Sequence, residues 1–342
     1  MDPAADRHSR QVRFTPLGPE GQTRLAQARV AVVGCGALGS AAAMALARAG
    51  VGHLRLVDRD VPELSNLPRQ VLFDEADVAA GLPKVVAAAN RLRTIDGTLS
   101  IEPVVTDLAA TNAARVLGGV ELIVDGTDNF ATRFLVNEFA CRERLPWIYG
   151  GAIGAEGRVL AVAPGRTACL RCLVPEPPDP GALPTCDTAG IIGPAALVVG
   201  AVQAAEAIKL LTGVAPSGRM LVFDLWEGAW RTVDLAGLAE RGCPTCRGTD
   251  HPWLDGRLGG GTAVLCGRDA VQVAPAAGAR VDLEAFARRA EALGRVTANP
   301  WIVRVVVEPG IELAVFADGR AIVSGTRDET RARSIVARSL GV

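Results

Sequence analysis

The chain has 342 residues, of which 49% are hydrophobic and only 4% are aromatic. This length predicts roughly two domains, with cores built mainly from Ala, Val, Leu and Ile. The net charge of −1 gives no electrostatic reason to expect nucleic acid or an anionic membrane as a partner. The eight cysteines are too sparse for a disulfide scaffold, and residues 1–13 show no signal pattern, so we expect a cytoplasmic protein.

The first half of the chain alternates strand-like and helical patterns. Residues 29–33 (RVAVV) form a continuous apolar run that ends in glycine, which is typical of a buried parallel strand. After two short helices within residues 1–27, strands are expected at 29–33, 53–58, 100–105, 121–125, 147–150 and 159–162, and helices at 38–49, 84–95 and 129–144. This alternation predicts a doubly wound, Rossmann-like α/β fold with a mostly parallel sheet.

A proline-rich stretch over residues 174–185 interrupts the alternation. Proline removes backbone donors and disfavours helix, so this stretch predicts a long loop. The apolar run 191–211 that follows contains Gln203, Glu206 and Lys209, and it therefore indicates a buried helix rather than a membrane span. Two further strands are expected at 220–225 and 230–233.

The pattern changes again after a glycine-rich segment near residue 260. Short strand patterns then alternate with two helices, at 282–293 and 328–340. We therefore expect a nucleotide-binding domain over residues 1–250, a linker over 251–261 and a small α+β accessory domain over 262–342.

A glycine-rich loop, Gly34-Cys35-Gly36-Ala37-Leu38-Gly39, follows the first predicted strand. Glycines at such a turn let the backbone N–H groups at the start of a helix approach a phosphate or a ribose. Asp58 ends the next predicted strand, where an acidic side chain can bind ribose hydroxyls. Taken alone, this pair of features fits NAD binding as well as ATP binding.

Further charged and polar residues distinguish these two ligands. Asn66 and Arg69 follow the second strand, Lys84 opens the next helix, and Asp128 lies just after another strand end. Arg10 lies in an N-terminal Arg-Gln-Val segment. An NAD site does not need several cations and an extra carboxylate, whereas an ATP site uses Lys and Arg for phosphate oxygens and a carboxylate for Mg²⁺. These residues therefore favour an ATP site.

Two Cys-x-x-Cys pairs lie far apart in the chain, at Cys169/Cys172 and Cys243/Cys246. Two intervening residues let a turn aim both sulfurs at one ion, so the two pairs predict a tetrahedral structural zinc site. Two independent redox pairs are the weaker interpretation. A zinc ion held by four thiolates would clip the crossover region of the fold together and would leave no open position for catalysis.

Eight short motifs occur together in a familiar order and spacing. They are RQV from Arg10, GCGALGS, LVDRDVPELSNLPRQ, GLPKV, DGTDN, CLRC, CDTAGIIGP from Cys186, and CPTC. On these motifs the chain resembles, from about residue 7 to 247, the ThiF/MoeB/HesA family of adenylyltransferases, which is related to the ubiquitin-activating enzymes. One mild departure is Ala37, where the family often has glycine.

The resemblance implies a role for each matching residue. Asp58 would bind the ATP ribose, while Asp128 would hold Mg²⁺ and Arg10 would reach into the ATP site of the other subunit of a homodimer. The nucleotide contacts would come from Gly34, Gly36, Gly39, Asp58, Asp60, Asn66, Arg69, Lys84, Asp128 and Asn129. The implied catalytic residues are Arg10, Arg69, Lys84, Asp128 and Cys186.

The implied reaction is activation of a carboxylate. The C-terminal Gly-Gly carboxylate of a ubiquitin-like sulfur-carrier protein would attack the α-phosphate of ATP, and pyrophosphate would leave. The carrier's sulfur would then serve molybdopterin or thiamine biosynthesis, or another thio-product. In several relatives the cysteine that matches Cys186 forms a thioester or acyl-disulfide with the activated carrier, and in others it is dispensable.

The accessory domain carries no motif that indicates catalysis. Its cysteine, Cys266, lies too near the start of the domain for a rhodanese-type loop, so we expect docking of the carrier or of a downstream partner rather than sulfurtransferase activity. The alternatives to carrier adenylation are an NAD-dependent oxidoreductase on the same sheet, a non-catalytic scaffold that binds a ubiquitin-like protein, and an enzyme that modifies a short peptide.

Overall fold

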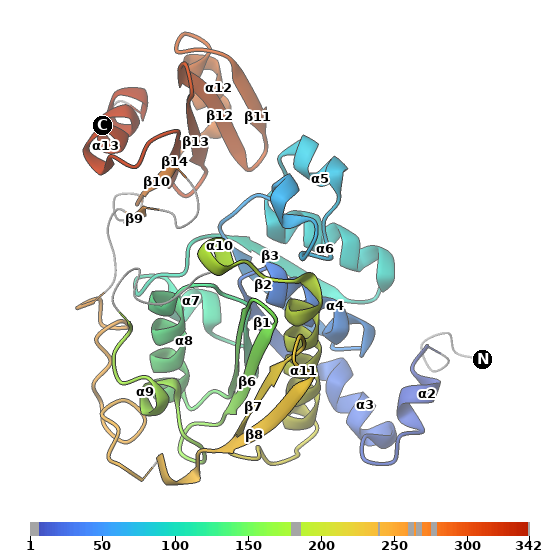
Figure 1. Cartoon of the computed structure of the whole chain (residues 1–342). Coiled ribbons are helices and arrows are strands. Elements are labelled where there is room, and N and C mark those ends of the chain that lie inside the picture. Colours follow the sequence, from blue (N-terminus) through green and yellow to red (C-terminus); the bar gives the residue numbers. More distant parts are fainter. Residues whose placement is uncertain are drawn as a thin grey trace. The chain divides into compact units, whose positions relative to one another are not determined.

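The computed structural model describes residues 7–178, 186–238, 240–258, 263–264, 269–274 and 279–340. The chain divides into two compact units, Met1–Leu258 and Gly259–Val342. In Figure 1 the first unit runs from blue to light orange, and the second unit carries the strands and helices coloured orange to red.

The first unit is built on one eight-stranded sheet in the order β3-β2-β1-β4-β5-β6-β7-β8. The strands are β1 (Arg29–Val33), β2 (His53–Asp58), β3 (Ser100–Val105), β4 (Leu122–Asp125), β5 (Trp147–Ile153), β6 (Glu156–Val162), β7 (Arg219–Asp224) and β8 (Ala229–Asp234). The first five in this order pair in parallel and the last three antiparallel. The strand order reverses between β1 and β4, which is where doubly wound sheets bind ligands. The predicted fold is confirmed.

Helices cover both faces of this sheet (Figure 1). They are α2 (Ser9–Val12), α3 (Gly18–Gln27), α4 (Ala37–Arg48), α5 (Glu75–Ala80), α6 (Lys84–Ile95), α7 (Ala113–Leu117), α8 (Phe130–Glu143), α9 (Leu170–Leu173), α10 (Cys186–Ala189) and α11 (Gly193–Leu211), with short 3₁₀ turns η1 (Leu64–Asn66) and η2 (Ala236–Leu238). Helices α4 and α11 pack against each other on one face, and α7 and α8 pack together on the other.

Helix α11 is long and apolar enough to cross a membrane by length and composition alone. In this fold it packs along α4 and over β5 and β6, and Gln203 in its middle is fully buried. The amide of Gln203 donates hydrogen bonds to the carbonyl oxygens of Asp125 (2.7 Å) and Ile148 (3.2 Å). These contacts are those of a helix in a protein core, as the sequence indicated.

Four short helices of the first unit, α5, α7, α9 and α10, were not predicted. Helix α5 begins with a capping box, in which Asp74 accepts a hydrogen bond from the backbone N–H of Asp77 and Asp77 accepts one from that of Asp74. That Asp-x-x-Asp spacing is a start signal that the sequence does contain. Helix α7 has only five residues and no side-chain cap, so local sequence offers little to find it by.

The second unit is a small α+β domain. Its antiparallel sheet has the order β11-β12-β13-β14-β10-β9. The elements are β9 (Ala263–Val264), β10 (Ala270–Val273), α12 (Leu283–Ala290), β11 (Val296–Asn299), β12 (Ile302–Glu308), β13 (Ile311–Phe316), β14 (Ala321–Ser324) and α13 (Glu329–Leu340). Its core joins the buried face of this sheet to Phe286 of α12 and to Ile335 of α13. This small α+β architecture agrees with the prediction, although β11 was missed.

The segment just after Asp250 packs on the first unit. The ring of Trp253 lies 4.5 Å from that of Phe134 on α8, measured between centroids. The backbone N–H of Leu254 donates a 2.9 Å hydrogen bond to the buried carboxylate of Glu138, also on α8. We therefore propose that the boundary of the nucleotide-binding domain lies after Leu258 rather than after Asp250.

Two truncations test this boundary. We expect a protein that ends at Leu258 to keep the melting temperature of the first unit. A protein that ends at Asp250 should lose at least about 3 kcal/mol of stability, because removing a buried Trp from a core costs roughly 3–5 kcal/mol. Urea unfolding followed by circular dichroism measures both. Equal stability of the two truncations would contradict the proposed boundary.

Candidate functional site

The glycine loop connects β1 to α4 and packs directly on the loop after β4. Gly34 has φ of +83°, and a Cβ there would lie 2.6 Å from the backbone of Gly126. A Cβ on Gly39 would lie only 1.8 Å from the carbonyl oxygen of Gly34. Only glycine, which has no Cβ, allows the backbone to approach this closely at both positions. The N-cap residue of α4, Gly36, has no side chain to satisfy the first N–H groups, so they are available to a ligand.

Asp58, at the carboxyl end of β2, ties this loop to the next one. One carboxylate oxygen accepts a 2.6 Å hydrogen bond from the backbone N–H of Cys35, and the other accepts a 2.7 Å bond from that of Asp60. Burial raises the pKa of Asp58, and the nearby Lys84 ammonium works in the opposite direction. Lys84 is buried at the start of α6, with its ammonium 3.8 Å from the Asp60 carboxylate.

The turn after β2 brings Asn66 and Arg69 to the same edge of the sheet. Asn66 is buried, and its side-chain oxygen accepts a hydrogen bond from the backbone N–H of Glu63 (3.2 Å). The Arg69 guanidinium donates to the carbonyl oxygen of Ser65 (2.8 Å), so it lies folded against its own turn. Contact of Arg69 with a triphosphate would require a change of rotamer.

Asp128 is exposed just after the carboxyl end of β4. The neighbouring Asn129 accepts a 2.9 Å hydrogen bond from the backbone N–H of Thr132, so its side chain caps α8. Asp125, the last residue of β4, is fully buried and accepts hydrogen bonds from both the N–H (2.9 Å) and the hydroxyl (2.6 Å) of Thr127. The loop that carries Asp128 is therefore held in place by the hydrogen bonds of Thr127 to the buried Asp125 carboxylate.

Three residues near this edge escaped sequence reasoning. Arg59 pairs with Asp107 at 3.0 Å, and Arg133 lies buried beneath the Asp128 loop. Burial works against ionisation of Arg133, but the carboxylates of Asp125 and also of Asp128 keep its pKa raised. Gln70 is buried beside Gly36, and its side-chain oxygen has no hydrogen-bond partner among the described residues. Arg59 and Gln70 lie within the recognised motif LVDRDVPELSNLPRQ, so their place in that motif could have marked them as candidate site residues.

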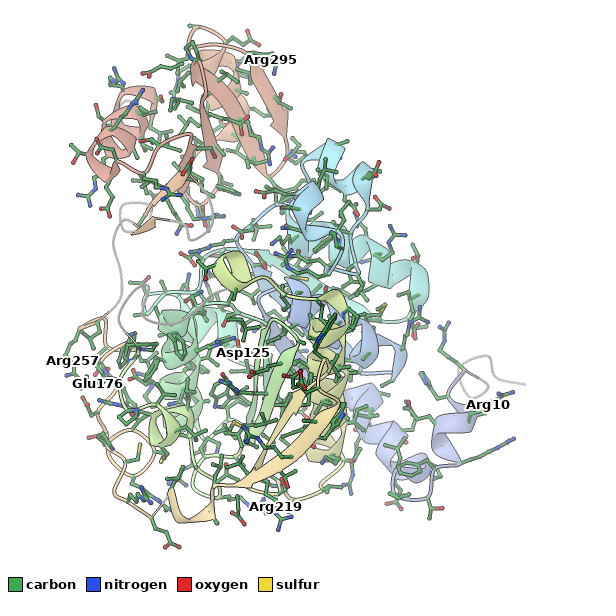
Figure 2. The ribbon with its side chains drawn as sticks, in the orientation of Figure 1. Arg10, Asp125, Glu176, Arg219, Arg257 and Arg295 are labelled. Atoms are coloured by element: carbon green, nitrogen blue, oxygen red, sulfur yellow. The ribbon has the colours of Figure 1, made fainter. Side chains whose placement is uncertain are left out.

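Arg10 is not part of this group within one chain. It lies on α2, at the far side of the unit from Asp125 (Figure 2). Cys186 begins α10, but its side chain and residues 179–185 before it lie outside the described residues. The structure thus brings together the glycine loop, Asp58, Asp60, Lys84 and the Asp128 loop.

The four paired cysteines converge, as predicted. Their sulfur atoms all lie within 4.8 Å of one another. The distances are 3.7 Å between Cys169 and Cys172, 3.7 Å between Cys169 and Cys243, and 3.5 Å between Cys172 and Cys246. A tetrahedral zinc with bonds of about 2.3 Å separates its sulfur ligands by about 3.8 Å, so these three distances are close to those of a zinc site. Four ligands fill the shell, which is typical of a structural site.

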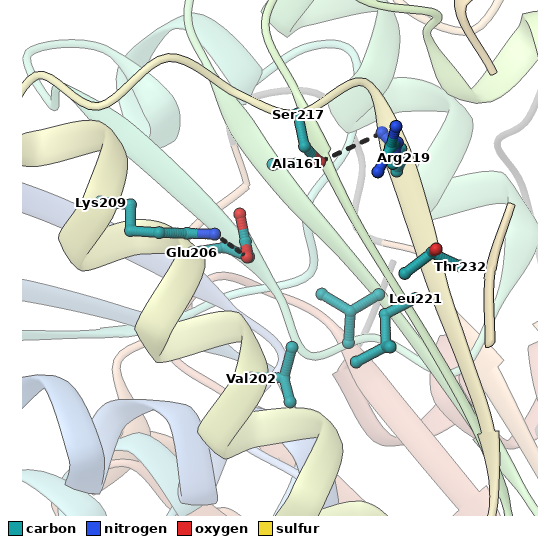
Figure 3. Close-up of a pocket in the computed structure, with 9 residues that line it drawn as sticks. Ala161, Val202, Glu206, Lys209, Ser217, Arg219, Leu221 and Thr232 are labelled. Carbon is teal, nitrogen blue, oxygen red and sulfur yellow. Dashed lines mark hydrogen bonds and ion pairs between the residues drawn. The ribbon is translucent and has the colours of Figure 1, made fainter. Parts of the chain in front are cut away.

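A cavity of about 290 Å³ lies elsewhere, between α11 and strands β6–β8 (Figure 3). Its polar lining includes the Glu206–Lys209 ion pair, and Arg219, whose backbone N–H donates to the hydroxyl of Ser217. These residues lie near the end of α11 and the start of β7. The start of α11, at Gly193, instead approaches Pro68 in the turn after β2. The polar lining of the cavity therefore lies toward the opposite end of α11 from that turn.

The sequence model of the ThiF family matches residues 8–245. This range contains the glycine loop, the Asp58 and Asp128 loops and three of the four clustered cysteines, and the fourth, Cys246, follows it directly. The chain belongs to the ThiF family. The resemblance found in the sequence motifs is thereby confirmed.

Two relatives place the chain within the ThiF family. The sulfur carrier protein ThiS adenylyltransferase of Bacillus subtilis is 42% identical over 98% of this chain and 99% of its own length. The sulfur carrier protein adenylyltransferase of Thermus thermophilus is 40% identical over 70% of this chain and 90% of its own length. The first match therefore includes the accessory domain, whereas the second is about as long as the ThiF region.

The fold is also that of solved ThiF-like structures. The crystal structure of Escherichia coli MccB with ATP superposes with a TM-score of 0.59, covering 67% of this chain and 71% of MccB at 24% identity. The crystal structure of PaaA gives a TM-score of 0.58 over 68% of this chain and 84% of that protein, at 22% identity. At these identities the likeness concerns the fold alone.

Proposed function

We propose that this protein adenylates the C-terminal Gly-Gly carboxylate of a ubiquitin-like sulfur-carrier protein, with ATP and Mg²⁺. The observation that carries the proposal is the match to the Bacillus subtilis sulfur carrier adenylyltransferase along 98% of the chain. The gathering of a glycine loop, an acidic strand end and a buried lysine at one sheet edge supports it. The motif resemblance implies that the carrier's sulfur serves molybdopterin or thiamine biosynthesis, or another thio-product.

The chemistry follows from the residues at this edge. The N–H groups at the start of α4 would meet phosphate oxygens, and Asp58 would hold the ribose. Lys84 and, after a change of rotamer, Arg69 would neutralise the triphosphate. Asp128 would hold Mg²⁺, which supplies charge neutralisation as pyrophosphate leaves. A carboxylate has no good leaving group, so transfer of AMP to it creates one, and this step needs positioning rather than a covalent nucleophile on the enzyme.

Two further parts of the proposal concern assembly and location. Arg10 lies away from Asp125 within one chain (Figure 2), so we propose a homodimer in which it reaches the second copy's site. Four thiolates that bind zinc must stay reduced, which supports a cytoplasmic location. Size-exclusion chromatography with light scattering tests the dimer, and a monomer that is fully active would contradict it.

Pyrophosphate exchange tests the reaction. We expect labelled pyrophosphate to enter ATP only when the purified protein is mixed with a small ubiquitin-like protein that ends in Gly-Gly from the same source. The matched control is the same carrier without its last glycine, which should give no exchange. Absence of exchange with any carrier, despite measurable ATP binding, would contradict the proposal and favour the scaffold or the peptide-modifying enzyme.

The same assay separates the proposed role of Cys186 from adenylation. If Cys186 accepts the activated carrier after AMP transfer, Cys186→Ala should keep exchange at the wild-type rate. The variant should lose only the carrier–protein adduct, which mass spectrometry detects. Loss of exchange in this variant would mean that Cys186 acts in the first step instead.

A further inference from the structure

Helix α8 runs between the two centres described above. It begins directly after Asp128 and its cap Asn129, and it is buried from Arg133 to Ala140. Its 14 residues extend about 20 Å. Three polar residues, Arg133, Asn137 and Cys141, follow one another at intervals of four and so share one face of the helix. We call these three residues the α8 row.

The first member holds the Asp128 loop. The Arg133 guanidinium donates to the Asp125 carboxylate (3.1 Å), to the carbonyl oxygen of Thr127 (2.6 Å) and to that of Gly150 (2.8 Å). Thr127 is the residue immediately before Asp128. Because a planar guanidinium presents its donors in a fixed fork, three acceptors define its position and that of the loop.

The other two members hold the Cys169 turn. The Asn137 side chain is fully buried; its oxygen accepts from the backbone N–H of Leu170 (2.9 Å) and its amide donates to the sulfur of Cys169 (3.7 Å). Cys141, one turn further along, is partly buried and packs against the same core cluster as Cys169. Donors around a metal-ligating sulfur orient it and adjust its basicity. Asn137 thus holds both the sulfur of Cys169, the first predicted zinc ligand, and the backbone of the next residue, Leu170.

We propose that the α8 row consists of positioning residues that fix the Asp128 loop at one end and the Cys169 sulfur at the other. The part that concerns Asp128 rests on the function proposed above, and the part that concerns Cys169 does not. Neither Asn137 nor Cys141 needs to touch a substrate or a metal. Their effect is to set the geometry of residues that do.

Zinc release tests the Cys169 end without any need for catalysis. We expect Asn137→Ala to release zinc to a coloured chelator at least about tenfold faster than wild type, since such supporting residues carry 10–100-fold in metal affinity. The matched control is Leu135→Ala, which leaves a cavity in the same buried helix without removing a hydrogen bond to the cysteines. Release from Asn137→Ala at the rate of the Leu135→Ala control would overturn the proposal.

A smaller change keeps the test decisive if Asn137→Ala does not fold. Asn137→Asp keeps the size of the side chain and the oxygen that accepts from Leu170, but it loses the amide that donates to the Cys169 sulfur. We expect faster zinc release from this variant than from Leu135→Ala. In cobalt-substituted protein, the thiolate-to-cobalt absorption should shift in Asn137→Asp and not in Leu135→Ala. Equal release rates and spectra in these two variants would contradict the role of Asn137.

The Mg²⁺ requirement of pyrophosphate exchange tests the Asp128 end. Arg133→Lys keeps a cation beside Asp125 but loses the fork, so we expect the half-saturating Mg²⁺ concentration to rise about tenfold. Leu135→Ala is again the control and should leave that concentration unchanged. An unchanged Mg²⁺ requirement in Arg133→Lys, with wild-type exchange present, would overturn this half of the proposal. Absence of exchange in the wild type would instead overturn the proposed function. The zinc-release measurement would still test the Cys169 end of the α8 row, because it needs no catalysis.

Discussion

Asp128→Ala should reduce carrier-dependent pyrophosphate exchange at least about 100-fold, because removing one group that stabilises developing charge costs roughly 10²–10³ in rate. Asp128 is exposed at a strand end, directly above a loop that Asp125 and Arg133 hold in place. Its carboxylate is thus free to bind an ion, while the loop beneath does not depend on it. The melting temperature of the variant should therefore remain that of wild type.

Glu121→Ala is the matched control for this prediction. Glu121 is also an exposed carboxylate, and it precedes β4 at the end of that strand opposite Asp128. It should leave exchange unchanged, which separates a local effect from a loss of net charge. Near-normal exchange by Asp128→Ala would remove Asp128 from the proposed Mg²⁺ site. Equal losses in the two variants would indicate a general electrostatic effect.

Removal of the metal should have the largest effect on stability. The cysteine cluster joins residues 169–172 to residues 243–246, and apparent zinc-binding energies in small zinc-binding domains reach roughly 10–16 kcal/mol. Even a fraction of this energy should lower the melting temperature by more than about 10 °C, because 1 kcal/mol shifts a domain of this size by about 2–4 °C. We expect this decrease in melting temperature both in the wild type after chelation and in the variant Cys243→Ser.

Re-addition of zinc distinguishes a metal effect from damage to the chain. Zn²⁺ should restore the melting temperature of the chelated wild type but not that of Cys243→Ser. Metal analysis should find one zinc per wild-type chain. A chelated protein that is free of zinc but melts at the wild-type temperature would show that the cluster does not support the fold.

The candidate nucleotide-binding edge of the sheet could be predicted because the order of strands and helices allows few ways of arranging them. Alternating strands and helices with short connections give a parallel sheet, and the carboxyl ends of its strands meet at one edge. Asp58 and Lys84 were placed together for this reason, and the structure joins them through the Asp60 loop. The convergence of the cysteine pairs could be predicted equally well, because the spacing within each pair already aims two sulfurs at one point.

The supporting contacts could not be predicted in the same way. Arg133 and Asn137 read as ordinary residues of a helix, because nothing in their local sequence says which carboxylate or sulfur they will meet. Their partners, such as Gly150 and Cys169, come from other elements and arrive only when the sheet and the crossover are packed. The ring contact of Trp253 with Phe134 could not be predicted for the same reason, because it depends on where α8 lies.

By itself the sequence determined the fold class, the sheet edge at which the glycine loop and the acidic strand end meet, and the convergence of the four paired cysteines. Each of these follows from local periodicity or from residue spacing, which the chain carries wherever it folds. Only the tertiary structure decided that Arg10 lies away from the site of its own chain and that α8 supports both centres. These features depend on contacts between segments distant in sequence, and packing rather than local pattern selects such contacts.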